Sequence, residues 1–176
     1  MEKFLTEQDI KTLAASFSLE VPLIKTVLQI ESSGSGFDKN TGLIKIQFEP
    51  HVFKKYTKIL IINGVDIQKN EWVAFNAASK VDFNAALLST SWGLGQIMGY
   101  NYKTAGYNSV EEMVDLFKRS EFHQFEGMLR FIKNNSAMYK ALKEKNWDEF
   151  AKRYNGPAYK DFHYDTKLSK TYASLI

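Results

Sequence analysis

No cysteine occurs among the 176 residues of this chain. Disulfide bonds and thiolate metal sites are therefore excluded, and the composition suits synthesis in a reducing compartment. Histidine is also scarce, with three in the chain, and His123 and His163 have no metal-ligand spacing with any partner. We therefore expect a protein that needs no metal and no cofactor.

Long apolar runs are absent as well. The longest, around residues 59–62, is far shorter than the roughly 20 residues that cross a bilayer, and residues 1–7 lack the apolar core of a secretory signal. Strong charge of one sign is also missing, because the net charge is +3 and the lysines and arginines do not cluster into a nucleic-acid-binding face. We expect neither stable membrane insertion nor nucleic-acid binding.

The chain has the composition of an ordinary globular domain, with 44% apolar and 24% charged residues. No repeat, low-complexity tract or linker interrupts it, so we expect residues 1–176 to form a single domain without a separate binding module. A polar turn at residues 39–42 leads into strand-like alternation over residues 43–49. Elsewhere the apolar spacing predicts helices over residues 6–17, 21–31, 52–59, 71–79, 82–90, 110–117, 122–132, 136–144, 147–154 and 165–175.

Glu31 ends the helix expected over residues 21–31, just before a polar, glycine-rich break. On a 3.6-residue period it shares a face with Ile24, Val27 and Leu28, so the acid continues an apolar stripe. Partial burial and the negative end of the helix dipole would both raise its pKa. A carboxyl group that is still protonated near neutral pH can serve as a general acid. The ordinary alternative is a solvated glutamate at a helix end.

Four short segments stand out from this background. They are Glu31-Ser32-Ser33-Gly34-Ser35-Gly36-Phe37, Ile46-Gln47-Phe48-Glu49-Pro50-His51-Val52-Phe53, Ser91-Trp92-Gly93-Leu94-Gly95-Gln96-Ile97-Met98-Gly99 and Arg153-Tyr154-Asn155-Gly156-Pro157. Together and in this order they resemble the phage endolysin N-acetylmuramidase family, and more distantly goose-type lysozymes and lytic transglycosylases. The resemblance extends from about Leu23 to Tyr172, which is most of the chain.

The resemblance implies a mainly α-helical, lysozyme-like single domain with a small β-hairpin beside the cleft. It also implies a glycosidase that cleaves the β-1,4 bond between N-acetylmuramic acid and N-acetylglucosamine in peptidoglycan. That reaction needs an acid to protonate the leaving oxygen and stabilisation of oxocarbenium character. Glu31 matches the family's acid, in agreement with its place on an apolar helix face.

Glu49 is the second carboxylate in the matched segments, and we expect it across the cleft from Glu31 as a base or a water-positioning group. An inverting reaction needs carboxyl groups about 6.5–9.5 Å apart and a retaining reaction about 5–5.5 Å, and the sequence leaves both open. The alternative is that Glu49 forms a salt bridge or caps the helix expected at residues 52–59. His51 either orients Glu49 or binds a sugar hydroxyl, or it is an ordinary structural histidine.

The glycine-rich segment of residues 91–99 suits a cleft wall, and Tyr154 and Asn155 resemble the family's Tyr-Asn pair. Gln96 offers a donor and an acceptor to an acetamido group, and Trp92 either stacks on a sugar or anchors the core. Asn155 would bind substrate and Tyr154 would lean toward Glu31, although Asn-Gly-Pro is also ordinary helix-capping chemistry. The predicted substrate-binding set is His51, Trp92, Gln96, Tyr154 and Asn155.

Three other functions fit the same residues. A lytic transglycosylase would use Glu31 alone and form 1,6-anhydro-muramic acid ends, so it would not need Glu49. A chitinase-like hydrolase would accept chitin oligomers, which lack the lactyl group. A non-catalytic wall-binding or virion structural protein would keep the fold, and Glu31 would be dispensable.

The lack of a wall-binding module suits a phage enzyme that attacks a thin Gram-negative wall. Without an export signal, such a protein would collect in the host bacterial cytoplasm. It would reach the periplasmic wall after membrane permeabilisation by a separate, holin-like protein. A virion-associated lysin would have a similar sequence. We expect a monomer.

Overall fold

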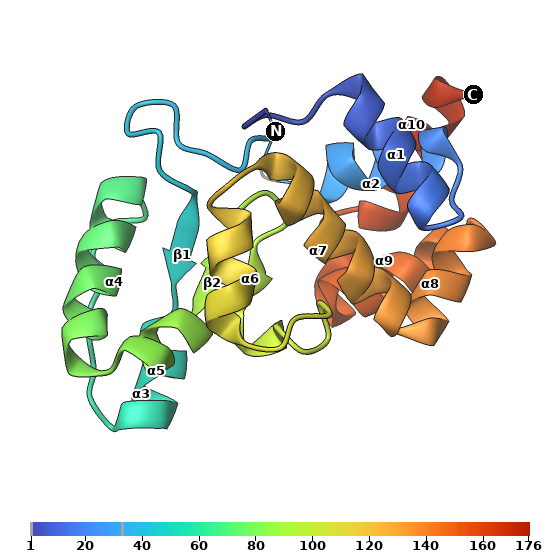
Figure 1. Ribbon diagram of the computed structural model, residues 1–176. Helices are drawn as coiled ribbons and strands as arrows, with labels where there is room; N and C mark the ends of the chain where they lie inside the picture. The colour runs from blue at the N-terminus through green and yellow to red at the C-terminus, as the bar shows by residue number, and fades with distance from the viewer. Residues whose placement is uncertain (1, 33) are drawn as a thin grey trace.

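The computed structural model describes residues 2–32 and 34–176. Helices dominate this part of the chain, as predicted, and short strands form one small sheet (Figure 1). The strands are β1 (Ile46–Phe48), β2 (Thr90–Trp92) and β3 (Ile97–Met98), and the 3₁₀ helices are η1 (Gly99–Asn101) and η2 (Pro157–Lys160). The α-helices are α1 (Glu7–Ser16), α2 (Val21–Glu31), α3 (Pro50–Thr57), α4 (Gln68–Val81), α5 (Phe83–Leu88), α6 (Val110–Phe117), α7 (Glu121–Asn134), α8 (Ser136–Lys143), α9 (Trp147–Asn155) and α10 (Tyr164–Leu175).

Signals at the helix ends explain why most predicted helices have nearly the right bounds. The Thr6 side chain accepts a hydrogen bond from the N–H of Asp9, and the Asp9 carboxylate accepts one from the N–H of Thr6, which makes a capping box before α1. Pro22 lies in the first turn of α2, where its missing N–H needs no partner. α3 begins at Pro50 for the same reason, two residues before the predicted start, and α4 begins three residues early at Gln68.

The sheet is antiparallel, with the strand order β1–β2–β3. Ile46 of β1 lies opposite Trp92 of β2, and β3 pairs with the other edge of β2. The sequence predicted a hairpin around residues 39–42, but that turn closes only an isolated bridge between Phe37 and Ile44. The hairpin of the sheet is β2–β3, and β1 joins it from far away in the chain. Local alternation cannot show which distant strand is the partner.

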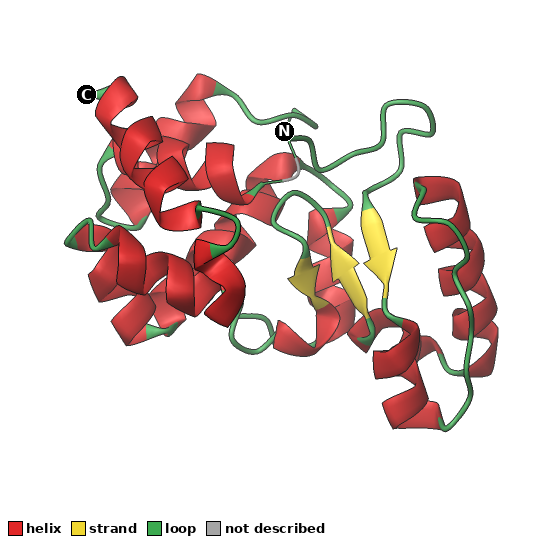
Figure 2. Ribbon diagram, turned by 180° about the vertical axis from the view of Figure 1, so that it is seen from behind, coloured by secondary structure: helices red, strands yellow, loops and turns green. Residues whose placement is uncertain are grey.

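Two clusters of buried side chains form the core. One gathers residues of α1, α2, α7, α8, α9 and α10, including Ile24 and Phe150. The other gathers residues of the sheet and of α3 to α6, including Phe48 and Trp92, and Phe131 of α7 packs against both. Figures 1 and 2 show the same division, with the sheet and α3, α4 and α5 on one side of α7 and with α1, α2, α8, α9 and α10 on the other.

β1 is an edge strand, and side chains of α4 form hydrogen bonds with the backbone N–H and C=O groups on its outer edge. Gln68 Oε1 accepts a hydrogen bond from the N–H of Ile46 at 2.9 Å, and Gln68 Nε2 donates to the Ile46 carbonyl at 2.8 Å. The buried Glu71 carboxylate accepts from the N–H of Phe48 at 2.7 Å. These contacts replace a neighbouring strand and hold the backbone in place just before Glu49.

No single helix within the described ranges is long and apolar enough to cross a membrane. α1 and α2 pass that test only as a pair, and the two helices are bent by 112° at their junction.

Candidate active site

Glu31 is the last residue of α2, and its side chain is partly buried. Burial disfavours the charged carboxylate and raises the pKa of Glu31 to about 7. The Asn155 amide donates a hydrogen bond to Glu31 Oε1 at 3.0 Å, which opposes part of that rise in pKa. A large fraction of the molecules therefore carries a protonated Glu31 near neutral pH, as a general acid requires.

The neighbours of Glu31 come from the end of α9. α9 ends at Asn155, and Gly156 follows it with a φ of +80°, a conformation that favours glycine. The Tyr154 ring stacks on Phe150, and its buried hydroxyl has no hydrogen-bond partner among the described residues. Burial and the nearby Glu31 charge both raise the pKa of Tyr154. The structure thus brings Tyr154 and Asn155 to Glu31, and the Asn155 amide contacts the acid itself.

Glu121, at the start of α7, holds the segment that follows Glu31. One of its carboxylate oxygens accepts a hydrogen bond from the N–H of Gly36 at 2.8 Å, and the other accepts from the N–H of Leu5 at 3.0 Å. The carboxylate thereby joins the segments before α1 and after α2 to the central helix. Sequence reasoning missed this residue because it lies 85 positions from Gly36.

Gln124, one turn further along α7, is fully buried and holds the turn between β2 and β3. Its side chain accepts from the N–H of Leu94 at 2.7 Å and donates to the carbonyl of Phe117 at 2.8 Å. A Cβ at Gly36 would lie 1.7 Å from Gln124 Oε1, and one at Gly93 would lie 2.6 Å from the same atom. Both motif glycines are therefore needed where the backbone passes over Gln124. Their presence in two motifs signals a close approach, but not the residue approached.

Gln96 lies in the same turn with a φ of +45°. Its Oε1 accepts from the Ser91 hydroxyl at 2.8 Å, and its Nε2 donates to the Gly93 carbonyl at 2.8 Å. One N–H and one lone pair of the amide remain for a ligand. Substrate binding by Gln96 stays a prediction, and the side chain also orders the turn.

Trp92 is fully buried, so its interpretation as a sugar-stacking platform is wrong. Its indole N–H donates to the Leu87 carbonyl at 3.1 Å, and Phe75 packs edge-on against its ring with centroids 5.3 Å apart. Trp92 lies opposite the buried Ile46 of β1, which places it on the core face of the sheet. The alternative interpretation, a core anchor, describes its position.

Glu49 follows β1 and occupies the N-cap position of α3, but its side chain makes no capping hydrogen bond. Its carboxylate lies 3.3 Å from Nδ1 of the exposed His51, an ion pair when the histidine is protonated. Partial burial raises the pKa of Glu49, His51 opposes that rise, and the charges of Glu71 and Asp66 add to it. The capping alternative is therefore not realised, whereas a contact between Glu49 and His51 is present.

The segments that carry the two acids meet opposite ends of β1. The N–H of Lys45 donates to the Gly36 carbonyl at 2.9 Å, so the segment after Glu31 lies beside the start of the strand. Glu49 follows the end of the strand, about 13 Å along an extended backbone from residue 45. Gln47 lies between them on the exposed face of β1. A polar strip therefore runs along the sheet toward Glu49.

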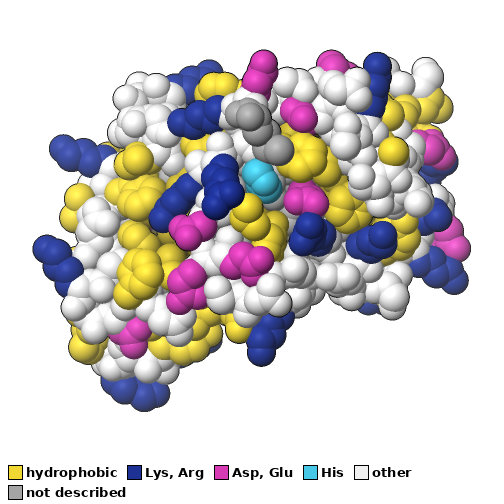
Figure 3. Space-filling view, viewed as in Figure 1, with side chains coloured by type: hydrophobic (Ala, Val, Ile, Leu, Met, Phe, Trp, Pro, Cys, Tyr) yellow, Lys and Arg dark blue, Asp and Glu magenta, His cyan; other side chains and the backbone are white. Residues whose placement is uncertain are grey.

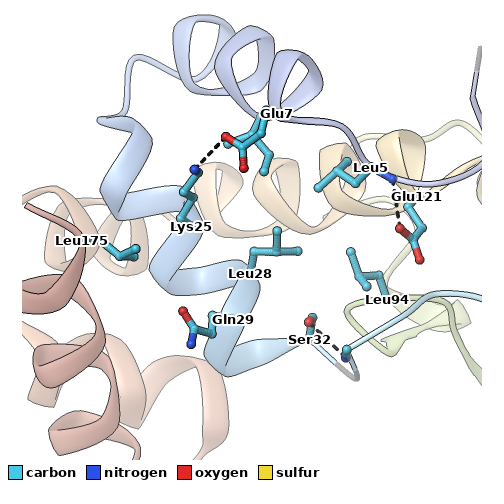
Figure 4. Close-up of a pocket in the computed structure, with 11 residues that line it drawn as sticks. Leu5, Glu7, Lys25, Leu28, Gln29, Ser32, Leu94, Glu121 and Leu175 are labelled. Atoms are coloured by element: carbon cyan, nitrogen blue, oxygen red, sulfur yellow. Dashed lines mark hydrogen bonds and ion pairs between the residues drawn. The ribbon is translucent and has the colours of Figure 1, made fainter.

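A pocket of about 470 Å³ lies along α2 (Figure 4). Leu28 and Leu94 line it together with Lys25, whose Nζ pairs with Glu7 at 2.7 Å. Glu31 is not among the residues that line this pocket. The environment of Glu31, and not this pocket, therefore marks the candidate site.

The described ranges contain no group of three or more histidine, aspartate or glutamate side chains that could hold a metal ion. On the face drawn in Figure 3, lysine and arginine side chains are scattered among acidic ones rather than gathered into one stripe. The groups that the structure gathers around Glu31 are the amide of Asn155 and the phenol of Tyr154.

Comparison with known proteins identifies the family. A family model described as Muramidase, N-acetylmuramidase, matches residues 20–67 and 62–176. The crystal structure of Burkholderia AP3 phage endolysin is similar, with a TM-score of 0.91, 31% sequence identity, and coverage of 99% of this chain and 72% of that chain. A search of curated proteins gave no match. The predicted endolysin-like, mainly helical fold is thereby confirmed, and the chain belongs to the N-acetylmuramidase family of glycoside hydrolases.

Proposed function

We propose that this chain is a phage endolysin that hydrolyses the β-1,4 bond between N-acetylmuramic acid and N-acetylglucosamine in peptidoglycan. The observation that carries the proposal is the partly buried Glu31, whose pKa lies near 7 beside Asn155. Membership of the N-acetylmuramidase family supports the substrate. The similarity to Burkholderia AP3 phage endolysin supports the biological role.

Glu31 acts as the general acid in this proposal. Its Oε1 accepts the Asn155 hydrogen bond, so the carboxyl proton resides on Oε2, from which it is donated to the glycosidic oxygen as the bond to the muramic acid C1 breaks. The reaction leaves a negative charge on Glu31. The Asn155 amide stabilises that charge. The charge also acts electrostatically on the nearby Tyr154 hydroxyl, which is buried and has no hydrogen-bond partner among the described residues.

Glu49 acts as the base or water-positioning group. A water molecule adds to C1 of the oxocarbenium-like sugar, and its proton passes to Glu49. The proximity of His51 favours the ionised form of Glu49 that this step needs. Gln96 and Asn155 are proposed to hold the sugar on the acid side, and His51 on the base side.

We also propose the setting in which the enzyme acts. The macromolecular partner is the glycan strand of peptidoglycan. The protein collects as a monomer in the host bacterial cytoplasm and reaches the periplasmic wall once a holin-like protein has permeabilised the membrane.

Mass spectrometry of peptidoglycan digested in oxygen-18 water tests this function. We expect fragments that end in reducing N-acetylmuramic acid carrying one oxygen-18 atom, and no such fragments from Glu31→Gln. Glu7→Gln, which changes an exposed glutamate outside the site, is the matched control. Ends in 1,6-anhydro-muramic acid would contradict hydrolysis, and equal cleavage of chitin oligomers would contradict the muramidase specificity. Undiminished digestion by folded Glu31→Gln would contradict the assignment of the acid.

A further inference from the structure

A second hollow lies at the end of the sheet that leads to Glu49. It has a volume of about 380 Å³ and is lined by His51, Val52, Lys55, Tyr56 and Tyr100. Tyr56 and Tyr100 are 49% and 47% exposed, and neither hydroxyl has a hydrogen-bond partner in the described part of the chain. Two aromatic side chains are therefore open to a ligand at this place.

The sheet explains why residues so far apart in the chain share this hollow. β1 and β3 both run antiparallel to β2, so they run parallel to each other and their last residues lie at the same end of the sheet. α3 starts directly after β1 and contributes Tyr56, while η1 starts directly after β3 and contributes Tyr100. The two tyrosines therefore lie at the same end of the sheet as Glu49.

The hollow continues the polar face of β1. Gln47 is exposed between the buried Ile46 and Phe48, and by strand alternation Glu49 belongs to the same face. His51 lies 3.3 Å from the Glu49 carboxylate and also lines the hollow. The hollow thus begins one side chain away from Glu49. A glycan strand that lies along this face of β1 reaches the hollow without crossing the core.

We propose that this hollow binds one N-acetylhexosamine ring of the glycan strand, at a subsite beyond Glu49. The proposal rests on the proposed function, which supplies the strand as substrate. A tyrosine offers an apolar ring face against which sugar C–H groups pack, and a hydroxyl that bonds to sugar oxygens. Lys55 and His51 add N–H donors for hydroxyl and acetamido oxygens.

A subsite remote from the scissile bond makes strand length matter. Binding free energy from a distant sugar raises kcat/KM only for strands long enough to reach it. Removing one of the two tyrosine rings should lower the preference for long strands by about twofold to tenfold, the range expected for one aromatic contact.

The experiment measures kcat/KM on peptide-free glycan strands of increasing length for the wild type, Tyr56→Ala, Tyr100→Ala and Tyr100→Phe. The ratio of kcat/KM on long strands to kcat/KM on short strands should fall about twofold to tenfold in both alanine variants. Tyr100→Phe should keep most of the wild-type ratio because the ring remains. Phe83→Ala is the matched control, because it removes a half-exposed ring from a different hollow between α5 and α6. Its ratio should equal that of the wild type.

Each other outcome overturns the proposal. An unchanged ratio in Tyr56→Ala and Tyr100→Ala would mean that the tyrosines do not bind sugar. Equal losses on all strand lengths, with a lower Tm, would assign the rings to folding. A loss that appears only when the series is repeated on strands that carry peptide stems would assign the hollow to the stem.

A binding measurement separates failure of this subsite from failure of the proposed function. Peptide-free strands are titrated into Glu31→Gln and into Glu31→Gln combined with Tyr100→Ala. Weaker binding by the double variant supports the subsite even if the wild type cleaves nothing, which would contradict the proposed function alone. Equal binding by the two variants, with an active wild type, would overturn the subsite alone.

Discussion

The two candidate catalytic carboxyl groups, Glu31 and Glu49, have different surroundings. Glu31 ends a helix, is partly buried, and has the neutral amide of Asn155 as its hydrogen-bond partner. Glu49 ends a strand, its side chain is 27% exposed, and its neighbours are the titratable groups of His51, Glu71 and Asp66. Desolvation therefore controls the proton of Glu31, whereas Glu49 also responds to charges around it. Two acids with such different surroundings suit different roles in one reaction.

The side chains that hold the backbone near the two acids also differ in their burial. Gln124, which holds the turn beside the segment after Glu31, is fully buried and bonds to two backbone groups in the core. Gln68, which holds β1 before Glu49, makes the same kind of contacts at a partly buried edge. The Glu31 side of the site is thus held from the core, whereas the Glu49 side is held by Gln68 at the sheet edge together with the buried carboxylate of Glu71.

The largest expected effect is on turnover. Glu31→Gln preserves shape but removes the proton, so kcat should fall by a factor on the order of 10² to 10⁴. Glu49→Gln should also lower kcat strongly, with little change in KM, because a base acts mainly in the transition state. Both constants are measured on purified peptidoglycan strands. Nearly wild-type kcat in Glu49→Gln, with reduced kcat in Glu31→Gln, would leave Glu49 a structural role and remove the comparison between the two acids.

A smaller effect is expected on folding. Gln124→Ala leaves the N–H of Leu94 and the carbonyl of Phe117 unpaired in the core, so it should lower the free energy of unfolding by about 2–5 kcal/mol. Gln68→Ala should cost only about 1 kcal/mol, because water reaches the partly buried edge of β1. Urea unfolding at one pH measures both. Equal losses of unfolding free energy in the two variants would contradict the difference in burial between Gln124 and Gln68 as the cause.

The raised pKa of Glu31 should also appear in stability. The folded-state pKa of about 7 lies above the ordinary value of 4.5, so the native state holds the proton more tightly, and stability falls as pH rises from 4.5 through 7. Glu31→Gln removes this penalty. It should therefore raise the free energy of unfolding by about 1–3 kcal/mol relative to the wild type at pH 8, and by much less at pH 4. A gain that is equal at both pH values would trace to packing instead.

The smallest effect concerns the pH profile. Above a pH of about 7, kcat/KM of the wild type should fall as Glu31 loses its proton. The Asn155 hydrogen bond lowers the pKa of Glu31, so Asn155→Ala should move this basic limb to higher pH. Gln96→Ala, which does not contact Glu31, should lower activity without moving the limb. A limb that moves to lower pH in Asn155→Ala would contradict the role of that hydrogen bond.

Local signals in the sequence were enough to predict the helices and the place of Glu31 on one of them. The Thr6 cap, Pro22 and the apolar period of residues 21–31 depend only on neighbours within a few positions, and so does the place of Glu31 on its helix. The motif order was enough to indicate the family, which the comparisons confirmed.

Tertiary structure decided the rest, because the deciding contacts join residues far apart in the chain. Trp92 lies in the core rather than against a sugar because its strand, β2, pairs with β1. The buried carboxylate of Glu121 and the amide of Gln124 have no local pattern, since their backbone partners come from other segments. The sequence alone determined the chemistry available in Glu31. Only the fold determined its pKa, because desolvation and the Asn155 hydrogen bond exist only once α2 and α9 meet.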